Sequence, residues 1–309
     1  MKFAPFFFLF TGAAALNTSI IRGVSWFGFE TQDRNLQCLW THDLQWNLAK
    51  MTELGFNSIR LPFSYDFVAA GKWERMDEFF DAVQKTNLSV ALDFHRIDDT
   101  HQSAKPYNDR VSFDNFLEAW NTILGRYHTV KNLVAVDTFN EYQSQDYVEW
   151  NNLARQIVNF IEKRYPERFT YYVGGTQWGG NIHYVNLDDL AFAKTRIKYS
   201  IHMYWFSIQQ EPLEEGWDFS FGDHDRLVIN VGEWGFISSS QKETDWAIRF
   251  LAWLKKKGIF NSYLWTWSWN SGDTQGTLKE DCHTVDEKKM TILRSYWAGA
   301  YRRLLRSAQ

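Results

Sequence analysis

Cysteine and proline are scarce in this chain, with 2 and 5 copies among its 309 residues. Two cysteines suit an oxidising compartment, yet they cannot build the disulfide framework of a small secreted domain. The sequence also lacks solenoid-type repeats, low-complexity tracts and any linker rich in proline, serine or threonine. These absences exclude repeat architectures and argue against a second, tethered binding module.

Positive charge is neither abundant nor gathered in one place. The chain has 33 Lys and Arg residues against 37 Asp and Glu residues, which gives a formal net charge of −4. Its basic residues form no stripe, and this argues against nucleic acid as the partner. The Gly-x-Gly-x-x-Gly turn of dinucleotide-binding sheets is also absent between the first predicted strand and the first predicted helix.

Apolar runs long enough to cross a bilayer are lacking as well. The chain opens with Lys2, a short apolar run over residues 3–10 and an Ala-rich stretch that ends at Ala15. This three-part pattern predicts a signal peptide over residues 1–15, with an ordered first helix as the alternative. We therefore expect residues 16–309 to form a secreted, monomeric domain that does not enter a membrane.

Aromatic residues, by contrast, make up 18% of the chain, with 16 Trp, 14 Tyr and 25 Phe. Many must belong to the core, but a flat aromatic face also stacks on the C–H face of a sugar ring. Trp40 and Trp178 are the strongest candidates for sugar platforms, because both lie in loops beyond predicted strand ends. The further candidates are Trp26, Trp205, Trp217 and Trp234, and core packing explains any one of the six nearly as well.

Short apolar segments rich in β-branched residues recur along the chain, which is typical of strands buried on both faces. Eight strands are predicted, over residues 20–26, 56–62, 89–94, 133–139, 170–173, 197–200, 227–231 and 260–269. Apolar residues at helical spacing predict helices over residues 41–54, 73–86, 113–127, 147–164, 242–257 and 289–306, with Thr41 and Ser112 as N-caps. This alternation fits a single α/β domain, a closed (β/α)8 TIM barrel, better than an open doubly wound sheet.

Polar side chains follow the carboxyl ends of these strands, where the chemistry of a barrel is usually located. The predicted register places there Arg60, His95, Asn140, Glu141, His202, Tyr204, Glu233 and Trp269. Glu141 and Glu233 each leave a buried strand, and two facing carboxyl groups are the minimum for cleaving a glycosidic bond. Chance packing is a poor explanation for so many polar groups around one opening, because buried polar groups need partners.

Seven motifs fall in the order seen in glycoside hydrolase family 5. They are residues 23–31 (GVSWFGFET), 54–62 (LGFNSIRLP), 92–96 (LDFHR), 140–141 (NE), 202–204 (HMY), 232–235 (GEWG) and 267–274 (WSWNSGDT). The chain most resembles the secreted, bacterial-type endo-β-1,4-glucanases of this family. The resemblance implies a retaining hydrolase that acts on a polysaccharide or oligosaccharide and uses no cofactor and no metal.

Carried over position by position, the resemblance makes Glu141 the acid/base and Glu233 the nucleophile. Arg60 and a hydrogen bond from Tyr204 would keep Glu233 ionised. Asn140 would bind the 2-hydroxyl of the sugar, where hydrogen bonds strengthen in the transition state.

The other site residues complete this assignment. His95 and His202 would contact neighbouring hydroxyls and hold the carboxylates in place. The ring of Trp269 would stack beneath the sugar that is cleaved. Trp265 and Trp267 would lie on the same strand face, because every second side chain of a strand points to the same side. Family members usually have Pro after the acid/base, whereas this chain has Tyr142.

Several alternatives stay open at this point. The substrate could be mannan, β-1,3-glucan, xyloglucan or a glycolipid, or the barrel could bind carbohydrate without cleaving it. A metal-dependent hydrolase would use the run over residues 95–101, but Asp98 and His101 fall in a loop away from the strand ends. Cys38 and Cys282 lie in loops that a barrel brings together, so a bridge and two free thiols are both possible.

Overall fold

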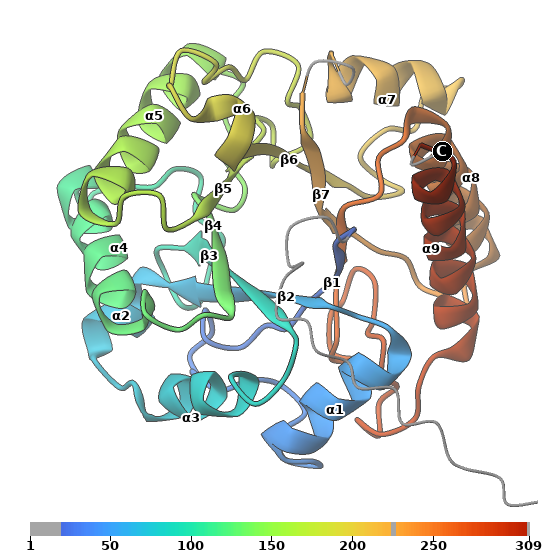
Figure 1. Cartoon of the computed structure of the whole chain (residues 1–309), viewed down its shortest axis with the longest axis horizontal. Helices are drawn as coiled ribbons and strands as arrows, with labels where there is room; N and C mark the ends of the chain where they lie inside the picture. The colour runs from blue at the N-terminus through green and yellow to red at the C-terminus, as the bar shows by residue number, and fades with distance from the viewer. Residues whose placement is uncertain (1–19, 224–226, 308–309) are drawn as a thin grey trace, which may run out of the picture.

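The computed structural model describes residues 20–223 and 227–307, and within them parallel strands close into a barrel (Figure 1). Each strand pairs with the next along the chain, and the last pairs with the first. The strands are β1 (Arg22–Ser25), β2 (Ser58–Ser64), β3 (Ser89–Arg96), β4 (Leu133–Asp137), β5 (Thr170–Gly174), β6 (Ile197–Met203), β7 (Ile229–Trp234) and β8 (Ser262–Leu264). The predicted (β/α)8 barrel is therefore confirmed, whereas the predicted signal peptide lies outside the described residues.

Helices surround the strands, as Figure 1 shows. They are α1 (Leu44–Leu54), α2 (Tyr65–Ala70), α3 (Glu74–Val83), α4 (Phe113–Tyr127), α5 (Tyr147–Arg164), α6 (Ala193–Arg196), α7 (Leu213–Phe221), α8 (Gln241–Lys257) and α9 (Glu287–Ser307). The last two, α8 and α9, pack side by side. In the described part of the chain, no helix combines the length and the apolar composition of a membrane span.

The burial pattern explains why these segments form strands and helices. Every residue of β2 and of β7 is buried, as expected for strands covered on both faces. The ring of Phe94 in β3 packs against Phe116 and Trp120 of α4, with centroids 4.2 and 5.5 Å away. The side chain of Ser112 caps α4 by accepting a hydrogen bond from the backbone of Asn115, which confirms the predicted start of this helix.

Some predicted boundaries are wrong for local reasons. Helix α1 starts after Asp43, whose carboxylate accepts the backbone N–H of Trp46 at 2.8 Å, so the cap is not Thr41. Strand β8 ends at Leu264 instead of residue 269, and the peptide bond that follows Trp265 is cis. The helices α2, α6 and α7 were not predicted, because short amphipathic segments give too few turns for a clear period.

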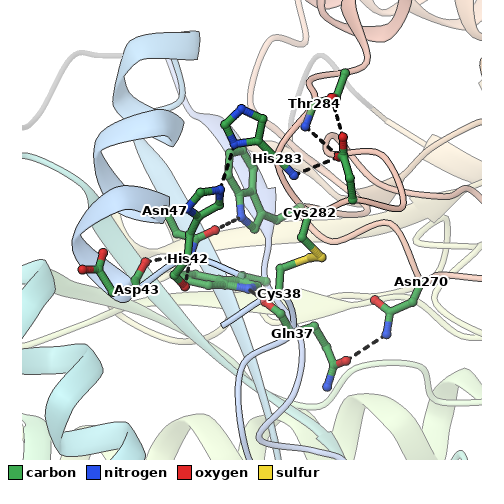
Figure 2. The surroundings of a disulfide bond; sticks show 12 residues. Gln37, Cys38, His42, Asp43, Asn47, Asn270, Cys282, His283 and Thr284 are labelled. Carbon is green, nitrogen blue, oxygen red and sulfur yellow. Dashed lines mark hydrogen bonds between the residues drawn. A yellow bond between two sulfur atoms is a disulfide. The ribbon is translucent and has the colours of Figure 1, made fainter. Parts of the chain in front are cut away.

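A disulfide joins Cys38, in the loop after β1, to Cys282, in the loop after β8 (Figure 2). The two Cα atoms are 5.4 Å apart, within the ordinary range for a bridge. On one side of it, the Asn270 amide donates a hydrogen bond of 2.8 Å to the side chain of Gln37. The bridge thus ties together the loops at the two ends of the barrel sequence, which decides between the two states left open by the sequence.

Candidate active site

A cleft of about 860 Å³ opens beyond the carboxyl ends of the strands. Seven of the ten predicted site residues line it: His95, Asn140, Glu141, Trp178, His202, Tyr204 and Glu233. Arg60 lies fully buried beneath the cleft, in contact with Glu233. Trp40 and Trp269, like Arg60, are predicted site residues that do not line this cleft.

The two predicted catalytic carboxylates face each other. Glu141 lies in the loop that follows β4, and Glu233 lies near the end of β7. One carboxylate oxygen of each, together with one ring nitrogen of His202, lie within 4.8 Å of one another. Retaining glycosidases hold their two carboxyl groups about 5–5.5 Å apart, whereas inverting enzymes leave roughly 6.5–9.5 Å for a water molecule. The separation therefore fits the retaining arrangement.

Glu233 is held as an ionised carboxylate by the groups that touch it. Arg60 donates a hydrogen bond to one carboxylate oxygen, and the phenol of Tyr204 donates one of 2.8 Å to the other. Burial by itself raises the pKa of Glu233, but the charges of His202 and Arg60 and the Tyr204 bond outweigh it and lower this pKa well below its ordinary value. A buried carboxylate with this environment is suited to nucleophilic attack.

His202 connects the two carboxylates. Its Nδ1 lies 3.0 Å from an oxygen of Glu141 and 3.6 Å from one of Glu233. Burial opposes a charge on this ring, but the two carboxylates outweigh it and raise the pKa of His202. The imidazolium can then donate Nδ1–H to Glu141 while its charge stabilises Glu233.

Two glycines make room for the His202 ring. A Cβ added to Gly232, just before Glu233, would lie 2.2 Å from the Ser200 hydroxyl and 3.0 Å from the His202 ring. A Cβ on Gly179, which has a φ of +72°, would also lie 3.0 Å from that ring. Glycine at these two positions allows the imidazole to sit between the carboxylates.

Beneath the cleft, Arg60 is surrounded by acceptors from neighbouring strands. Its guanidinium lies 3.1 Å from a carboxylate oxygen of Asp93 and donates hydrogen bonds of 2.9 Å to Asp137 and 2.7 Å to the Asn140 side chain. Burial raises the pKa of both aspartates to about 7, although the charge of Arg60 pulls each value down. Arg60 thus holds Glu233 and Asn140 in place, and the two aspartates hold Arg60.

His95 is a neutral hydrogen-bonding group in this arrangement. Burial lowers the pKa of His95 to about 4. Its Nδ1–H donates a bond of 2.6 Å to Asp93, which leaves Nε2 free to accept the Asn140 amide at 3.4 Å. The ring also stacks on Trp265, with centroids 5.4 Å apart and planes within 10°.

Trp265, and not Trp269, lines the cleft. The Trp265 ring lies nearly parallel to the rings of His95 and Phe27, and its indole N–H donates a bond of 3.1 Å to Ser271. Because β8 ends at Leu264, the period of two does not extend through the tryptophans that follow. The predicted common face is therefore wrong: Trp267 is fully buried and Trp269 packs partly buried against the core.

Tyr142, which stands where family members usually have proline, anchors the loop that carries Glu141. Its ring is buried and stacks on Trp150 of α5 with centroids 5.0 Å apart. Its hydroxyl donates a hydrogen bond to Glu149, which also accepts bonds from Lys105 and Tyr107. The loop that carries Glu141 is thus attached to α5 and to the loop after β3.

Three described groups of side chains have ligand atoms close enough to hold a metal ion. Two share Glu233: one adds Asp93 and His95, and the other adds Glu141 and His202. Their ligand atoms already bond to one another and to Arg60 and Tyr204. The third consists of Asp66, Asp98 and Asp99, where Arg110 and Arg34 pair with the carboxylates, and it does not include His101.

The sequence is similar to a known protein family and to several known proteins. The model of the family "Cellulase (glycosyl hydrolase family 5)" matches residues 18–273. The chain is 24% identical to the major extracellular endoglucanase of Xanthomonas campestris pv. campestris, over 91% of this chain and 68% of that protein. It is 25% identical to an endoglucanase of Paenibacillus polymyxa, over 88% of this chain and 81% of that protein.

Solved structures show the same fold. The catalytic domain of the Xanthomonas endoglucanase superposes with a TM-score of 0.82 at 24% identity, covering 91% of this chain and 95% of that one. A variant endocellulase of Pyrococcus horikoshii in complex with cellotetraose gives a TM-score of 0.81 at 23% identity, with coverages of 90% and 93%. The family match spans most of the chain and includes both facing carboxylates, so the chain belongs to the cellulase family, glycosyl hydrolase family 5.

Proposed function

We propose that this protein is a retaining endo-β-1,4-glucanase that cleaves cellulose-type β-glucans. The observation that carries the proposal is the pair of carboxylates at the barrel mouth, one oxygen of each within 4.8 Å of the other. The endoglucanase relatives from Xanthomonas and Paenibacillus support the substrate class.

The reaction follows from the environments of the two carboxylates. Glu233, ionised and held by Arg60 and Tyr204, attacks the anomeric carbon and forms a covalent glycosyl ester. Glu141 gives a proton to the glycosidic oxygen as the bond to the leaving sugar breaks. Glu141 then takes a proton from a water molecule, which attacks the ester carbon and frees Glu233, so the product keeps the β configuration.

Other residues of the cleft stabilise the sugar during these steps. The Asn140 amide, fixed by Arg60 and His95, shares Arg60 with Glu233 and is placed to bind the 2-hydroxyl. The Trp265 face floors the sugar, and Trp178, which is 57% exposed, offers a second face farther along the cleft.

We further propose that the protein is secreted as a monomer after cleavage behind Ala15. A disulfide persists in an oxidising compartment, and the Xanthomonas relative is described as extracellular. Expression in a secreting host and mass spectrometry of the protein in the medium test this proposal: an N-terminus at Leu16 is expected, and an intact Met1 would contradict it.

A substrate screen tests the proposed activity. Reducing ends are measured on carboxymethyl cellulose, mannan, laminarin and xyloglucan, with and without a chelator. We expect the highest rate on carboxymethyl cellulose, a loss of viscosity that runs ahead of reducing ends, and no effect of the chelator. A higher rate on another glycan would contradict the proposed specificity. Loss of activity with the chelator would favour metal chemistry. Binding without cleavage would show that the barrel is a carbohydrate-binding protein and not an enzyme.

A further inference from the structure

Four exposed rings, each in contact with the next, start at the rim of the cleft: Phe219, His183, Tyr184 and Tyr147, called here the aromatic strip. Phe219, at the end of α7, lines the cleft. The other three residues lie outside the cleft lining. They come from the loop after β5 and from the first turn of α5.

Each ring of the aromatic strip packs against the next. His183 stacks on Phe219 with centroids 4.7 Å apart, and Tyr184 meets the edge of His183 at 4.4 Å. Tyr147 follows, 5.0 Å from Tyr184. The aromatic surface therefore continues without a break from the cleft to the start of α5.

These rings are exposed although they touch one another. Phe219 is 50% exposed, Tyr184 51% and Tyr147 43%. Large aromatic side chains that are left this open, in one continuous patch, are more typical of a binding surface than of a core margin.

Polar contacts fix the backbone beneath the strip. The His183 ring donates Nδ1–H to the Phe219 carbonyl at 2.9 Å, which sets the orientation of the imidazole. The backbone N–H of Ile182 donates to Ser220 at 2.9 Å, and the Asn151 side chain of α5 donates to the Tyr184 carbonyl at 3.0 Å. The loop after β5 is thus attached to both α7 and α5, so the strip is held in place before any ligand binds.

A further exposed ring, that of Trp178, lies beside the loop that carries Glu141. Trp178, which shares the cleft lining with Phe219, donates its backbone N–H to the carbonyl of Tyr142, the residue after Glu141. A glucan that crosses Glu141 on its way out of the cleft would meet Trp178 and Phe219 before it reaches Tyr184.

We propose that the aromatic strip binds the part of a β-glucan chain that extends beyond the cleft, on the side where the leaving sugar departs. This inference rests on the proposed function, because the occupant is the continuation of the chain that the cleft cleaves. Sugar units would pack against Phe219, then against Tyr184, whose plane is turned by 79° from that of Phe219, and then against Tyr147.

The double variant Tyr147→Ala/Tyr184→Ala tests the proposal, with Tyr147→Phe/Tyr184→Phe as the matched variant that keeps both rings. Ile248→Ala, on α8, is the control for removing another exposed apolar side chain. We expect the alanine pair to raise the KM for carboxymethyl cellulose about 3- to 10-fold. Hydrolysis of an aryl β-cellobioside, which fills only the cleft, should not change, and the phenylalanine pair should match the wild type on both substrates.

Affinity electrophoresis in gels that contain hydroxyethyl cellulose measures binding without turnover, so it separates the strip from the proposed activity. Reduced retardation of the alanine pair supports the strip even if the aryl cellobioside is not hydrolysed, a result that would refute only the enzymatic function. An alanine pair that matches the wild type in KM and retardation would overturn the strip, as would a phenylalanine pair as impaired as the alanine pair. If the double variant does not fold, Tyr184→Ala alone carries the same comparison.

Discussion

The hydroxyl of Tyr142 donates a hydrogen bond to Glu149, in the first turn of α5, and this contact holds the loop that carries Glu141. A proline in this position could not make such a bond, because it has no side-chain donor. The stacking of Tyr142 on Trp150 adds a second attachment to the same helix. The chain therefore fixes Glu141 by side-chain contacts at the point where its relatives usually have proline.

Tyr142→Phe should lower the activity on β-glucan more than the activity on aryl glycosides. The variant keeps the stacked ring but loses a hydrogen bond to a carboxylate, which contributes about 1.5–3 kcal/mol. A loosened loop impairs proton donation, and a good leaving group needs little of it. The measurement is kcat/KM on both substrates beside Tyr107→Phe, which removes another hydroxyl from Glu149 at a residue not adjacent to Glu141. Equal losses in the two variants would show that Tyr142 has no special relation to Glu141.

Glu141→Ala should reduce hydrolysis of β-glucan by about 10²- to 10⁴-fold, the usual contribution of a general acid. A dinitrophenyl β-cellobioside needs no protonation of its leaving group, so its glycosyl-enzyme should still form. Hydrolysis of that intermediate would be slow, and added azide should accelerate it and yield a β-azide. Equal damage to both substrates without azide rescue would remove Glu141 from the acid/base role.

Trp265→Ala and Trp269→Ala should have different effects. Trp265 lines the cleft, and the loss of a stacked aromatic face should lower kcat/KM by about tenfold or more. Trp269 packs against the core, so its removal should lower the unfolding temperature while the folded variant keeps its KM. Thermal unfolding and kinetics on the two variants check this, and a raised KM in Trp269→Ala alone would restore the sequence-based assignment.

Asp137→Asn should change the pH dependence of stability. Burial raises the pKa of Asp137 from 3.8 to about 7 in the folded protein. The unfolded chain therefore releases this proton first, and the stabilisation present below the unfolded pKa is lost as the pH rises through the folded value. Asparagine does not titrate, so the unfolding temperature of the variant relative to the wild type should rise between about pH 5 and pH 7 and level off above that.

Asp189→Asn is the matched control for this series. The hydrogen bond from Arg155 lowers the pKa of Asp189, so this carboxylate is ionised in both states over the same range. The difference in unfolding temperature between Asp189→Asn and the wild type should stay constant with pH. A difference for Asp137→Asn that is constant, or that falls with pH, would show that this buried carboxyl does not titrate as described.

The sequence predicted those parts of the fold and of the site that follow from a regular pattern. Apolar runs buried on both faces predicted the barrel, and the residues that follow them predicted Glu141 and Glu233 at one mouth. Arg60 was also predicted, but Asp93 and Asp137 were missed, although charged residues inside apolar strands were a visible signal.

The parts that were missed depend on irregular backbone or on contacts distant in sequence. Trp269 was predicted to stack beneath the cleaved sugar because β8 was expected to continue, whereas the strand ends at Leu264. The aromatic strip combines α7, the loop after β5 and the start of α5. No local pattern links Phe219 to Tyr184 and Tyr147, which only the folded barrel brings together.

In the proposed mechanism, Glu233 forms a covalent bond to the sugar with Glu141 beside it. The most direct measurement is mass spectrometry of the protein after reaction with dinitrophenyl 2-deoxy-2-fluoro-β-cellobioside, which slows release of the intermediate. We expect one fluorocellobiosyl unit on the peptide that contains Glu233 and no adduct in Glu233→Gln. An adduct on another residue, or hydrolysis of natural substrate to the α-anomer without any adduct, would contradict it.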